Sequence, residues 1–438
     1  MKSKGLTIAT VVLAALLGAL YWSNRHKPAD TTETIATPTP SEPAPVILKL
    51  TETDINKIEL KKKGADQLVI SKDSSGKWQI TAPKPMGVDE QVVSGIVSSL
   101  SSLNSERLVE EKAANPGRYG LAEPSVELTV TDKNNTTHKL LIGDDTPTGS
   151  GAYVQLAGDP KVFTIASFTK GSLDKGLNDL RDKRLITADP DKITRVELSG
   201  KQSIEFSRDK EQWQILKPQP LRADGVKVEE LLRKITDARM DTTDSDATKA
   251  ASAFAAGTAV ATAKVTTDTG TQQLEVKKDK NNYYAKSSVT DGVYKVASDL
   301  GEALDKKLSD FRNKKVFDFG FTEPSKIEIQ DGTKTYSLSK SGEDWSSTDG
   351  KKFDKTTVQP IVEKLGDLTA TDFADTGFGA SALQITVTSS DGKHIEKVAL
   401  AKGSKNNLAR RENESSFYVL DEKTIDDIEK LLTNLKNT

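Results

Sequence analysis

Residues Glu211–Ile235 read EQWQILKPQPLRADGVKVEELLRKI: a strand with a tryptophan, a proline loop and an amphipathic helix. Two other stretches repeat this order: KWQITAPKPMGVDEQVVSGIVSSL at Lys77–Leu100 and DWSSTDGKKFDKTTVQPIVEKL at Asp344–Leu365. Their tryptophans, Trp78, Trp213 and Trp345, are separated by 213 − 78 = 135 and 345 − 213 = 132 residues. Self-similarity at a fixed period indicates repeated modules, so we expect three copies of one fold.

Each repeated helix is predicted from an aspartate and an apolar stripe. Asp89, Asp224 and Asp354 stand at N-cap positions, where a short carboxylate accepts hydrogen bonds from first-turn amides. The apolar residues that follow recur at helical spacing and predict a buried stripe. They are Val93, Ile96, Val97, Leu100 and Leu103; Val228, Leu231, Leu232 and Ile235; and Val358, Ile361, Val362, Leu365 and Leu368. Pro360 belongs in a first turn because it lacks an amide proton, so the third helix is expected to start near Thr356.

The tryptophans have two interpretations. They could be stacking platforms for a sugar or base, or large core residues between strand and helix. One tryptophan at the same place in each module favours the core interpretation.

The remainder of each module predicts strands and a closing helix. SVELTVTD alternates Val126, Leu128 and Val130, the period of a half-buried strand. HKLLIGD, AYVQLAG and KVFTIA follow, joined by turn residues, which indicates an antiparallel meander. The alanine-rich segment 251–265 has less bulk than its counterpart, so thinner packing is expected there. We predict an α+β fold: three tandem repeats of an antiparallel meander sheet with two amphipathic helices each, preceded by one N-terminal transmembrane helix.

A charged element follows each of the first two closing helices. LRDKRLI at 180–186 and FRNKKVF at 311–317 correspond, 131 residues apart (311 − 180). One interpretation is a docking patch; the favoured one is cations that face the helix dipole. The possible docking residues are Arg181, Lys183, Arg184, Arg312, Lys314 and Lys315.

The segment 6–22 carries no charge and is predicted to be a membrane anchor. As a helix its 17 residues span roughly 25 Å, which suits a thin hydrocarbon core. A cleaved signal peptide is the rival, but Leu20–Trp22 spoils the small-x-small cleavage pattern, and no cysteine follows for lipoprotein processing. Tyr21 and Trp22 suit a membrane interface. The expected membrane residues are Leu6, Ile8, Val11, Val12, Leu13, Leu16, Leu17, Leu20, Tyr21 and Trp22.

The domain order follows from these segments. The stretch before module 1 is rich in Pro and Thr and predicts an extended tether. Positive charge is nearly even around the anchor, so the inward N-terminus rests on resemblance to ordinary signal anchors. The predicted parts are a cytoplasmic tip (1–5), the anchor (6–22), the tether (23–45), module 1 (46–186), module 2 (187–319) and module 3 (320–438).

Composition and motifs argue against several functions. The 62 Lys and Arg nearly balance the 64 Asp and Glu, so no strongly basic face invites nucleic acid. Without cysteine there is no thiolate metal site or cysteine nucleophile. Ser167 and Lys170 match S-x-x-K, but S-D-N and K-T-G are missing. His138 and His394 lie at equivalent edges of different modules. We expect no catalytic, cofactor or metal residue.

Five motifs together resemble the bacterial family called domain of unknown function 4340. They are YGLAEP (119–124), LRDKRLI (180–186), KITRVEL (192–198), WQILKP (213–218) and ADGVKV (223–228). The resemblance implies an anchored envelope protein; some members are encoded beside gliding-motility-type ABC transporters, and the family has no known catalytic residue.

These observations favour a non-enzymatic, membrane-anchored scaffold or binding protein on the outer face of the bacterial inner membrane. Its partners would be that membrane and an ABC transporter permease or another envelope protein, without nucleic acid or cofactor. The alternative is a periplasmic glycan- or peptide-binding module, which predicts exposed Tyr153, Tyr283, Tyr284 and Tyr418. A serine hydrolase that uses Ser167 is the less favoured third hypothesis.

Overall fold

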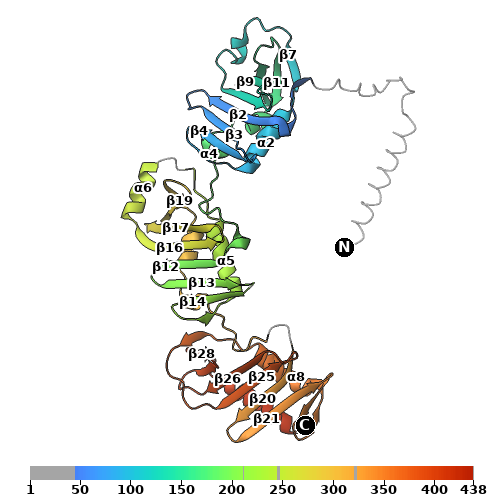
Figure 1. Ribbon diagram of the computed structural model, residues 1–438, viewed down its shortest axis with the longest axis vertical. Coiled ribbons are helices and arrows are strands. Elements are labelled where there is room, and N and C mark those ends of the chain that lie inside the picture. Colours follow the sequence, from blue (N-terminus) through green and yellow to red (C-terminus); the bar gives the residue numbers. More distant parts are fainter. Residues whose placement is uncertain (1–44, 211, 244–246, 320–322, 438) are drawn as a thin grey trace, which may run out of the picture. The chain divides into compact units, whose positions relative to one another are not determined.

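The computed structural model describes residues 45–210, 212–243, 247–319 and 323–437. The chain divides into two compact units, one that ends at Asp182 and one that begins at Lys183. The first unit holds a nine-stranded antiparallel sheet, and the second holds sheets of eight and nine strands (Figure 1). The fold is α+β and built from repeated antiparallel-sheet modules, as predicted. The expected anchor and tether lie outside the described residues, and no helix within those residues has the length and apolar character to cross a membrane.

Module 1 has the strand order β5-β4-β3-β2-β8-β9-β10-β11-β7, beside a small β1–β6 pair. Its strands are β1 (Val46–Lys49), β2 (Ile55–Lys62), β3 (Leu68–Lys72), β4 (Trp78–Ala82), β5 (Met86–Gly87), β6 (Ser102–Asn104), β7 (Arg107–Glu110), β8 (Val126–Asp132), β9 (Thr137–Asp145), β10 (Gly151–Leu156) and β11 (Val162–Ala166). Its helices are η1 (Glu52–Asp54), α2 (Glu90–Ser101), η2 (Pro116–Tyr119), α3 (Ser167–Leu173) and α4 (Leu177–Leu180).

Module 2 repeats the order as β15-β14-β13-β12-β16-β17-β18-β19. Its strands are β12 (Arg195–Gly200), β13 (Ser203–Asp209), β14 (Gln212–Lys217), β15 (Leu221–Arg222), β16 (Thr258–Thr267), β17 (Gly270–Asp279), β18 (Asn282–Ser287) and β19 (Val293–Val296). Its helices are η3 (Pro190–Lys192), α5 (Gly225–Thr236), α6 (Ala247–Ala256), α7 (Ser298–Leu304) and η4 (Leu308–Asp310).

Module 3 has the order β23-β22-β21-β20-β25-β26-β27-β28-β24. Its strands are β20 (Pro324–Asp331), β21 (Lys334–Ser341), β22 (Asp344–Ser347), β23 (Lys352–Phe353), β24 (Asp372–Ala374), β25 (Leu383–Ser389), β26 (Ile395–Ala401), β27 (Asn407–Arg411) and β28 (Phe417–Leu420). Its helices are α8 (Lys355–Gly366) and α9 (Thr424–Asn437). Pro360 lies inside α8, so its placement in a first turn was wrong; the start at Lys355 is one residue before the predicted one.

Module 2 departs from the other modules at one sheet edge. Strands β7 and β24 flank β11 and β28, but within the described residues no strand takes this place beside β19. The Asp241 amide still donates to the Lys295 carbonyl at 2.9 Å, and the Asp241 carboxylate then accepts from Thr243 to form a turn. The alanine-rich stretch that follows forms α6, since alanine has the highest helix propensity. The prediction of two helices per module is therefore wrong for module 2, and also for module 1, where the expected closing helix is divided into α3 and α4.

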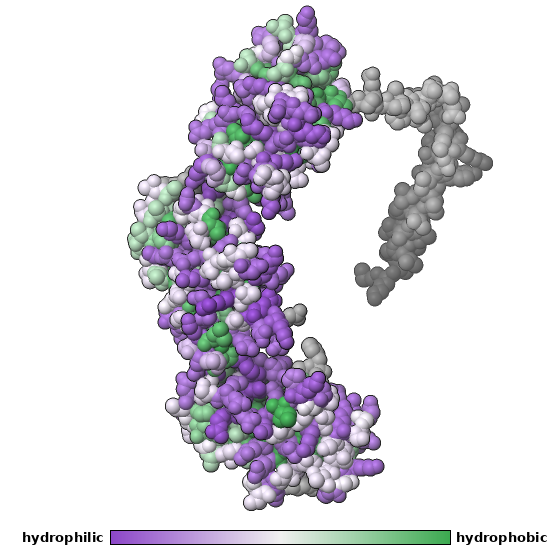
Figure 2. Space-filling view, viewed as in Figure 1, coloured by the Kyte–Doolittle hydropathy of each residue, from purple (hydrophilic) through white to green (hydrophobic). Residues whose placement is uncertain are grey.

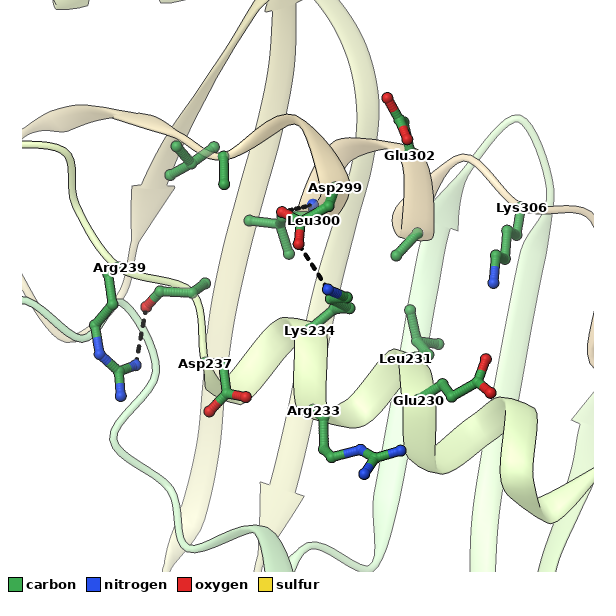
Figure 3. Close-up of a pocket in the computed structure, with 14 residues that line it drawn as sticks. Glu230, Leu231, Arg233, Lys234, Asp237, Arg239, Asp299, Leu300, Glu302 and Lys306 are labelled. Atoms are coloured by element: carbon green, nitrogen blue, oxygen red, sulfur yellow. Dashed lines mark hydrogen bonds and ion pairs between the residues drawn. The ribbon is translucent and has the colours of Figure 1, made fainter. Parts of the chain in front are cut away.

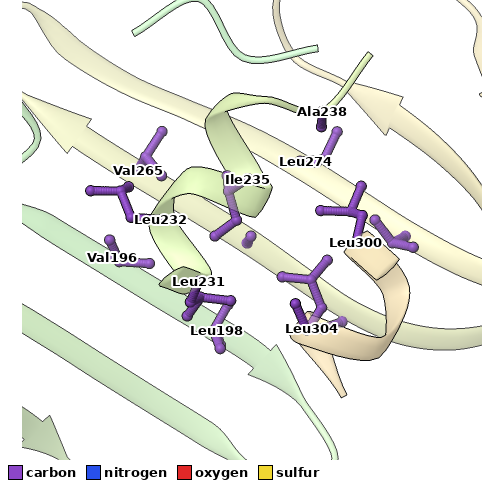
Figure 4. Packing of buried hydrophobic residues seen from close by; sticks show 14 of the residues in the cluster. Val196, Leu198, Leu231, Leu232, Ile235, Ala238, Val265, Leu274, Leu300 and Leu304 are labelled. Carbon is purple, nitrogen blue, oxygen red and sulfur yellow. The ribbon is translucent and has the colours of Figure 1, made fainter. Parts of the chain in front are cut away.

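Each module has its own hydrophobic core between sheet and helices. In module 2 the inward stripe of α5 meets sheet residues and α7 (Figure 4). Residues in this contact include Val196, Leu198, Leu231, Leu232, Ile235, Ala238, Val265, Leu274, Leu300 and Leu304. Full burial of such side chains stabilises by roughly 1.5–3 kcal/mol each. Outside the cores, the face visible in Figure 2 is mainly hydrophilic, with small dispersed hydrophobic patches.

The segment that enters each later module is fixed in the same way. Phe311 belongs to the core of module 2, whereas Val316, five residues on, belongs to that of module 3. The Arg411 guanidinium donates to the Val316 carbonyl. In module 2 the Ser287 hydroxyl donates to the carbonyl of Leu185, which occupies the corresponding place. LRDKRLI and FRNKKVF are therefore equivalent in structure as well as in sequence.

Candidate functional site

A groove of about 780 Å³ runs between α5 and α7 of module 2 (Figure 3). Its floor is apolar: Leu231, Ala238, Val296, Leu300 and Ala303. Its rim carries both signs of charge: Glu230, Arg233, Lys234, Asp237, Arg239, Asp299, Glu302 and Lys306. An apolar centre inside a polar rim is the usual anatomy of a protein-binding surface.

Helix periodicity determines which residues reach this rim. Asp224 caps α5 by accepting a hydrogen bond from the Lys227 amide at 3.2 Å. Val228 and Leu232 then point into the core, at 0% and 1% exposure. Residues one or two places further along the helix, such as Arg233, consequently face outward.

An ion pair joins the two helices across the groove. Lys234 Nζ lies 2.6 Å from Asp299 Oδ2 (Figure 3). This hydrogen bond raises the pKa of Lys234 and lowers the pKa of Asp299. Because both side chains are about half exposed, solvent screens the attraction and its contribution to stability is small.

Module 3 has the same ion pair between its two helices. Lys364 stands ten residues after its cap aspartate (364 − 354), as Lys234 does (234 − 224). Its Nζ lies 3.0 Å from Asp427 Oδ2, and this hydrogen bond lowers the pKa of Asp427.

Module 1 replaces both members of the pair. The residue ten places after the cap (99 − 89) is Ser99. Phe168 is the second residue of α3, as Asp299 is the second residue of α7. The Phe168 side chain is 78% exposed. Our sequence reasoning missed Phe168 as a site; counting positions from each cap aspartate was the signal that could have found it.

A second polar cluster joins modules 2 and 3 within the second unit. Arg222 of β15 donates from Nε to Glu414 at 3.0 Å and from Nη2 to the Tyr418 hydroxyl at 2.9 Å. Tyr418 in turn donates to Glu414 at 2.7 Å. Burial raises the pKa of Tyr418, which keeps the phenol neutral and able to donate. For Arg222, burial lowers the pKa, but Tyr418 and Glu414 outweigh it and the net shift is upward.

Arg312, one of the possible docking residues, is buried at 7% exposure. It donates to the Ser416 hydroxyl and stacks on Phe373, with its guanidinium carbon 3.5 Å from the ring centroid. Burial lowers its pKa. The Arg312 guanidinium therefore contacts module 3 and is not available on the surface to dock a partner.

The other five possible docking residues lie along backbone connections. Arg181 bridges to Val88, Arg184 to Arg239 and Lys315 to Thr369. The carbonyls of Lys183 and Lys314 accept from the amides of Met240 and Ala370. The backbone of both charged elements therefore hydrogen-bonds to neighbouring segments of the fold.

The three repeated aspartates are N-caps: their carboxylates accept from amides of the first helical turn. Trp213 and Trp345 are buried in their cores, and Trp78 is half-buried against its own. The expectation of exposed tyrosines is wrong for three of the four, because Tyr283, Tyr284 and Tyr418 are buried and Tyr153 is half-buried.

Lys170 and Ser167 have separate partners. The Lys170 ammonium forms an ion pair with Asp145, at 2.7 Å from Oδ1. The hydrogen bonds of the described residues do not join it to Ser167, whose amide donates to the Ser150 carbonyl. His394 is exposed beside Asp391. The described residues contain no group of three or more His, Asp or Glu side chains that could hold a metal ion.

These features define an α+β protein of repeated antiparallel-sheet modules. The chain belongs to the family described as Domain of unknown function (DUF4340), whose model matches residues 78–220 and 213–386. Both matches begin at a repeated tryptophan and run through the charged element into the next module.

No curated protein matches the chain. Among solved structures it is similar to a DNA polymerase sliding clamp from Pseudomonas aeruginosa with ligand, at 10% identity over 86% of this chain and 93% of that chain, with a TM-score of 0.17. It is also similar to the DNA polymerase III subunit beta of that organism, at 10% identity over 86% and 94%, with a TM-score of 0.16. TM-scores this low establish no shared fold.

Proposed function

We propose that the protein is a non-enzymatic, membrane-anchored extracytoplasmic scaffold, accessory to an ABC-type transporter or another envelope complex. Three tandem repeats would stand on the outer face of the bacterial inner membrane, held by a single transmembrane helix at 6–22. The uncharged segment and the Pro/Thr-rich tether support this location. What is typical of the family supports the transporter or envelope partner.

The observation that carries the scaffold proposal is the cluster of Arg222, Glu414 and Tyr418. Arg222 comes from module 2, and Glu414 and Tyr418 come from module 3. Tyr418 is buried, the other two are partly buried, and the three side chains hydrogen-bond to one another. Removing one charged partner from such a cluster is strongly unfavourable, whereas the intact cluster favours one arrangement. A chain that uses its buried charges to hold modules together suits a scaffold.

The contacts of Lys170 support the non-enzymatic part of the proposal. A lysine that activates a serine must be neutral and within hydrogen-bond reach of it. Lys170 is paired with Asp145 instead. The proposal predicts that an activity-based serine probe does not label the protein and that Ser167→Ala changes no property of the membrane complex.

A crosslinked pull-down from solubilised native membranes tests the function. Full-length tagged protein is compared with a chain that begins at Val46. We expect an integral membrane protein, a transporter permease above all, to be recovered more strongly by the full-length chain. Recovery of soluble ligand or wall fragments alone would favour the glycan- or peptide-binding alternative.

A further inference from the structure

The outward face of α2 differs from that of α5 at each of four corresponding positions. An offset of 135 residues relates the two helices, as it does their tryptophans. Ser94, Gly95, Ser98 and Ser99 stand where α5 has Glu229, Glu230, Arg233 and Lys234. Four charged side chains of module 2 are thus small and uncharged in module 1, while the inward stripes of both helices remain apolar.

Two glycines on these helices have no role in packing within the module. A Cβ added to Gly95 of α2 or Gly171 of α3 would meet nothing within 4 Å. Glycine inside a helix is unfavourable because it loses the most backbone freedom. In α7 the fold itself requires Gly301, because a Cβ there would lie 2.1 Å from the Tyr283 ring. Open space above Gly95 and Gly171 leaves room for close approach by another chain.

Phe168 adds a large apolar side chain to this face. It occupies the place of Asp299, and the Lys234–Asp299 distance of 2.6 Å shows that this place adjoins that of Ser99. The nearby charge of Lys170 is neutralised by Asp145. An exposed aromatic side chain next to small residues suits an interface anchor, which would bury its ring against a partner.

The position of module 1 in the chain favours a membrane partner. Module 1 directly follows the expected tether, whereas modules 2 and 3 keep the ion pair and lie further along. Fully extended, the 23 residues 23–45 span roughly 70 Å at about 3.1 Å per residue. Module 1 therefore stays within reach of the membrane surface.

We propose that Ser94, Gly95, Ser98, Ser99, Phe168 and Gly171, the module 1 helix face, dock an uncharged helix of an integral membrane protein. This rests on the proposed function and names its surface. The partner helix must be uncharged at the contact, because a charge placed there would lose water without gaining an ion pair. Small residues allow close backbone approach, as between membrane helices, and Phe168 inserts beside them.

Site-specific photocrosslinking tests the proposal on the full-length chain in native membranes. Phe168 is replaced by p-benzoyl-phenylalanine, which keeps an aromatic ring at an exposed position. The matched control carries the same group at Asp427 of module 3. We expect irradiation to link position 168, and not position 427, to an uncharged helix of a membrane-spanning protein, located by mass spectrometry of the linked peptide.

Other products overturn the proposal. Adducts with a second copy of the chain, with lipid or with a soluble protein would assign the face to that occupant. Equal yields at 168 and 427, or no product at 168, would leave the face without a specific partner. If the pull-down recovers an integral partner while position 168 gives any of these results, the inference fails and the proposed function stands. If the pull-down recovers none, the function fails.

Discussion

The helix layers of modules 1 and 2 share a core and differ at the surface. Val93, Ile96 and Leu100 of α2 are as buried as the corresponding residues of α5. Their outward neighbours are serine and glycine in α2 but two glutamates, an arginine and a lysine in α5. The comparison teaches that packing against the sheet fixes the inward stripe of a repeat, while the outward positions can take on separate tasks.

The largest effect is expected from substitutions in the buried apolar stripe, which α2 and α5 share. Leu100→Ala in module 1 and Ile235→Ala in module 2 each remove a fully buried side chain. We expect each to destabilise its own module by about 3 kcal/mol, through lost burial and the cavity left behind. Hydrogen exchange of α2 and α5 amides measures both. A cost near zero in one module would show that its helix does not pack as described.

A pair of glycine substitutions sharpens the difference between the two surfaces. Gly301→Ala places a methyl group against the Tyr283 ring and should destabilise module 2 by about 2 kcal/mol. Gly95→Ala meets open space and should stabilise α2 by about 1 kcal/mol through helix propensity. Hydrogen exchange of α7 and α2 reads the two signs. Destabilisation by Gly95→Ala would mean that the module itself needs this glycine.

The caps should behave alike in all modules. Asp89→Ala, Asp224→Ala and Asp354→Ala each remove the acceptor for first-turn amides. We expect a loss of about 1 kcal/mol for each helix. Asn at the same positions provides the control, because it still accepts these hydrogen bonds. A loss confined to one module would break the equivalence of the three helix starts.

The smallest effect concerns pH. Because the folded-state pKa of Asp299 is lowered, its contribution to stability is present above the unfolded pKa of about 4 and is lost as pH falls through the folded value. Asp299→Asn should therefore slightly increase exchange in α7 at pH 7 relative to wild type. That difference in exchange should vanish in strong acid. Substitution of Phe168, which has no charge, should cause no pH-dependent change in the exchange of α3. A difference that persists in acid would contradict the ion-pair explanation.

Periodicity made much of this fold predictable. Trp78, Trp213 and Trp345 gave the repeat, and the aspartates before each apolar stripe gave the helix starts. Helix α6 was missed because Asp241 and Thr243 turn the chain away from a sheet edge, which depends on a tertiary contact with Lys295.

The candidate sites were less predictable because charge alone does not reveal burial. Arg312 reads as a surface cation, but Ser416 and Phe373, distant in sequence, surround it. From the sequence, Tyr418 was a candidate ligand-binding aromatic, because its burial could not be foreseen. In the structure its hydroxyl contacts Arg222 and Glu414 between modules 2 and 3. Phe168 could have been found from the sequence by comparing the outward positions of the repeats, rather than by searching for catalytic motifs.

The most direct test introduces into module 1 the ion pair that joins the two helices of module 3. The full-length double variant S99K/F168D restores the missing ion pair, and K364S/D427F makes the reverse exchange in module 3. Both variants are compared with wild type by crosslinked pull-down from native membranes, with hydrogen exchange of α2 and α8 to verify folding. We expect S99K/F168D to lower recovery of the integral membrane partner by about tenfold or more, whereas K364S/D427F should match wild type. Wild-type recovery by a correctly folded S99K/F168D protein would contradict this expectation.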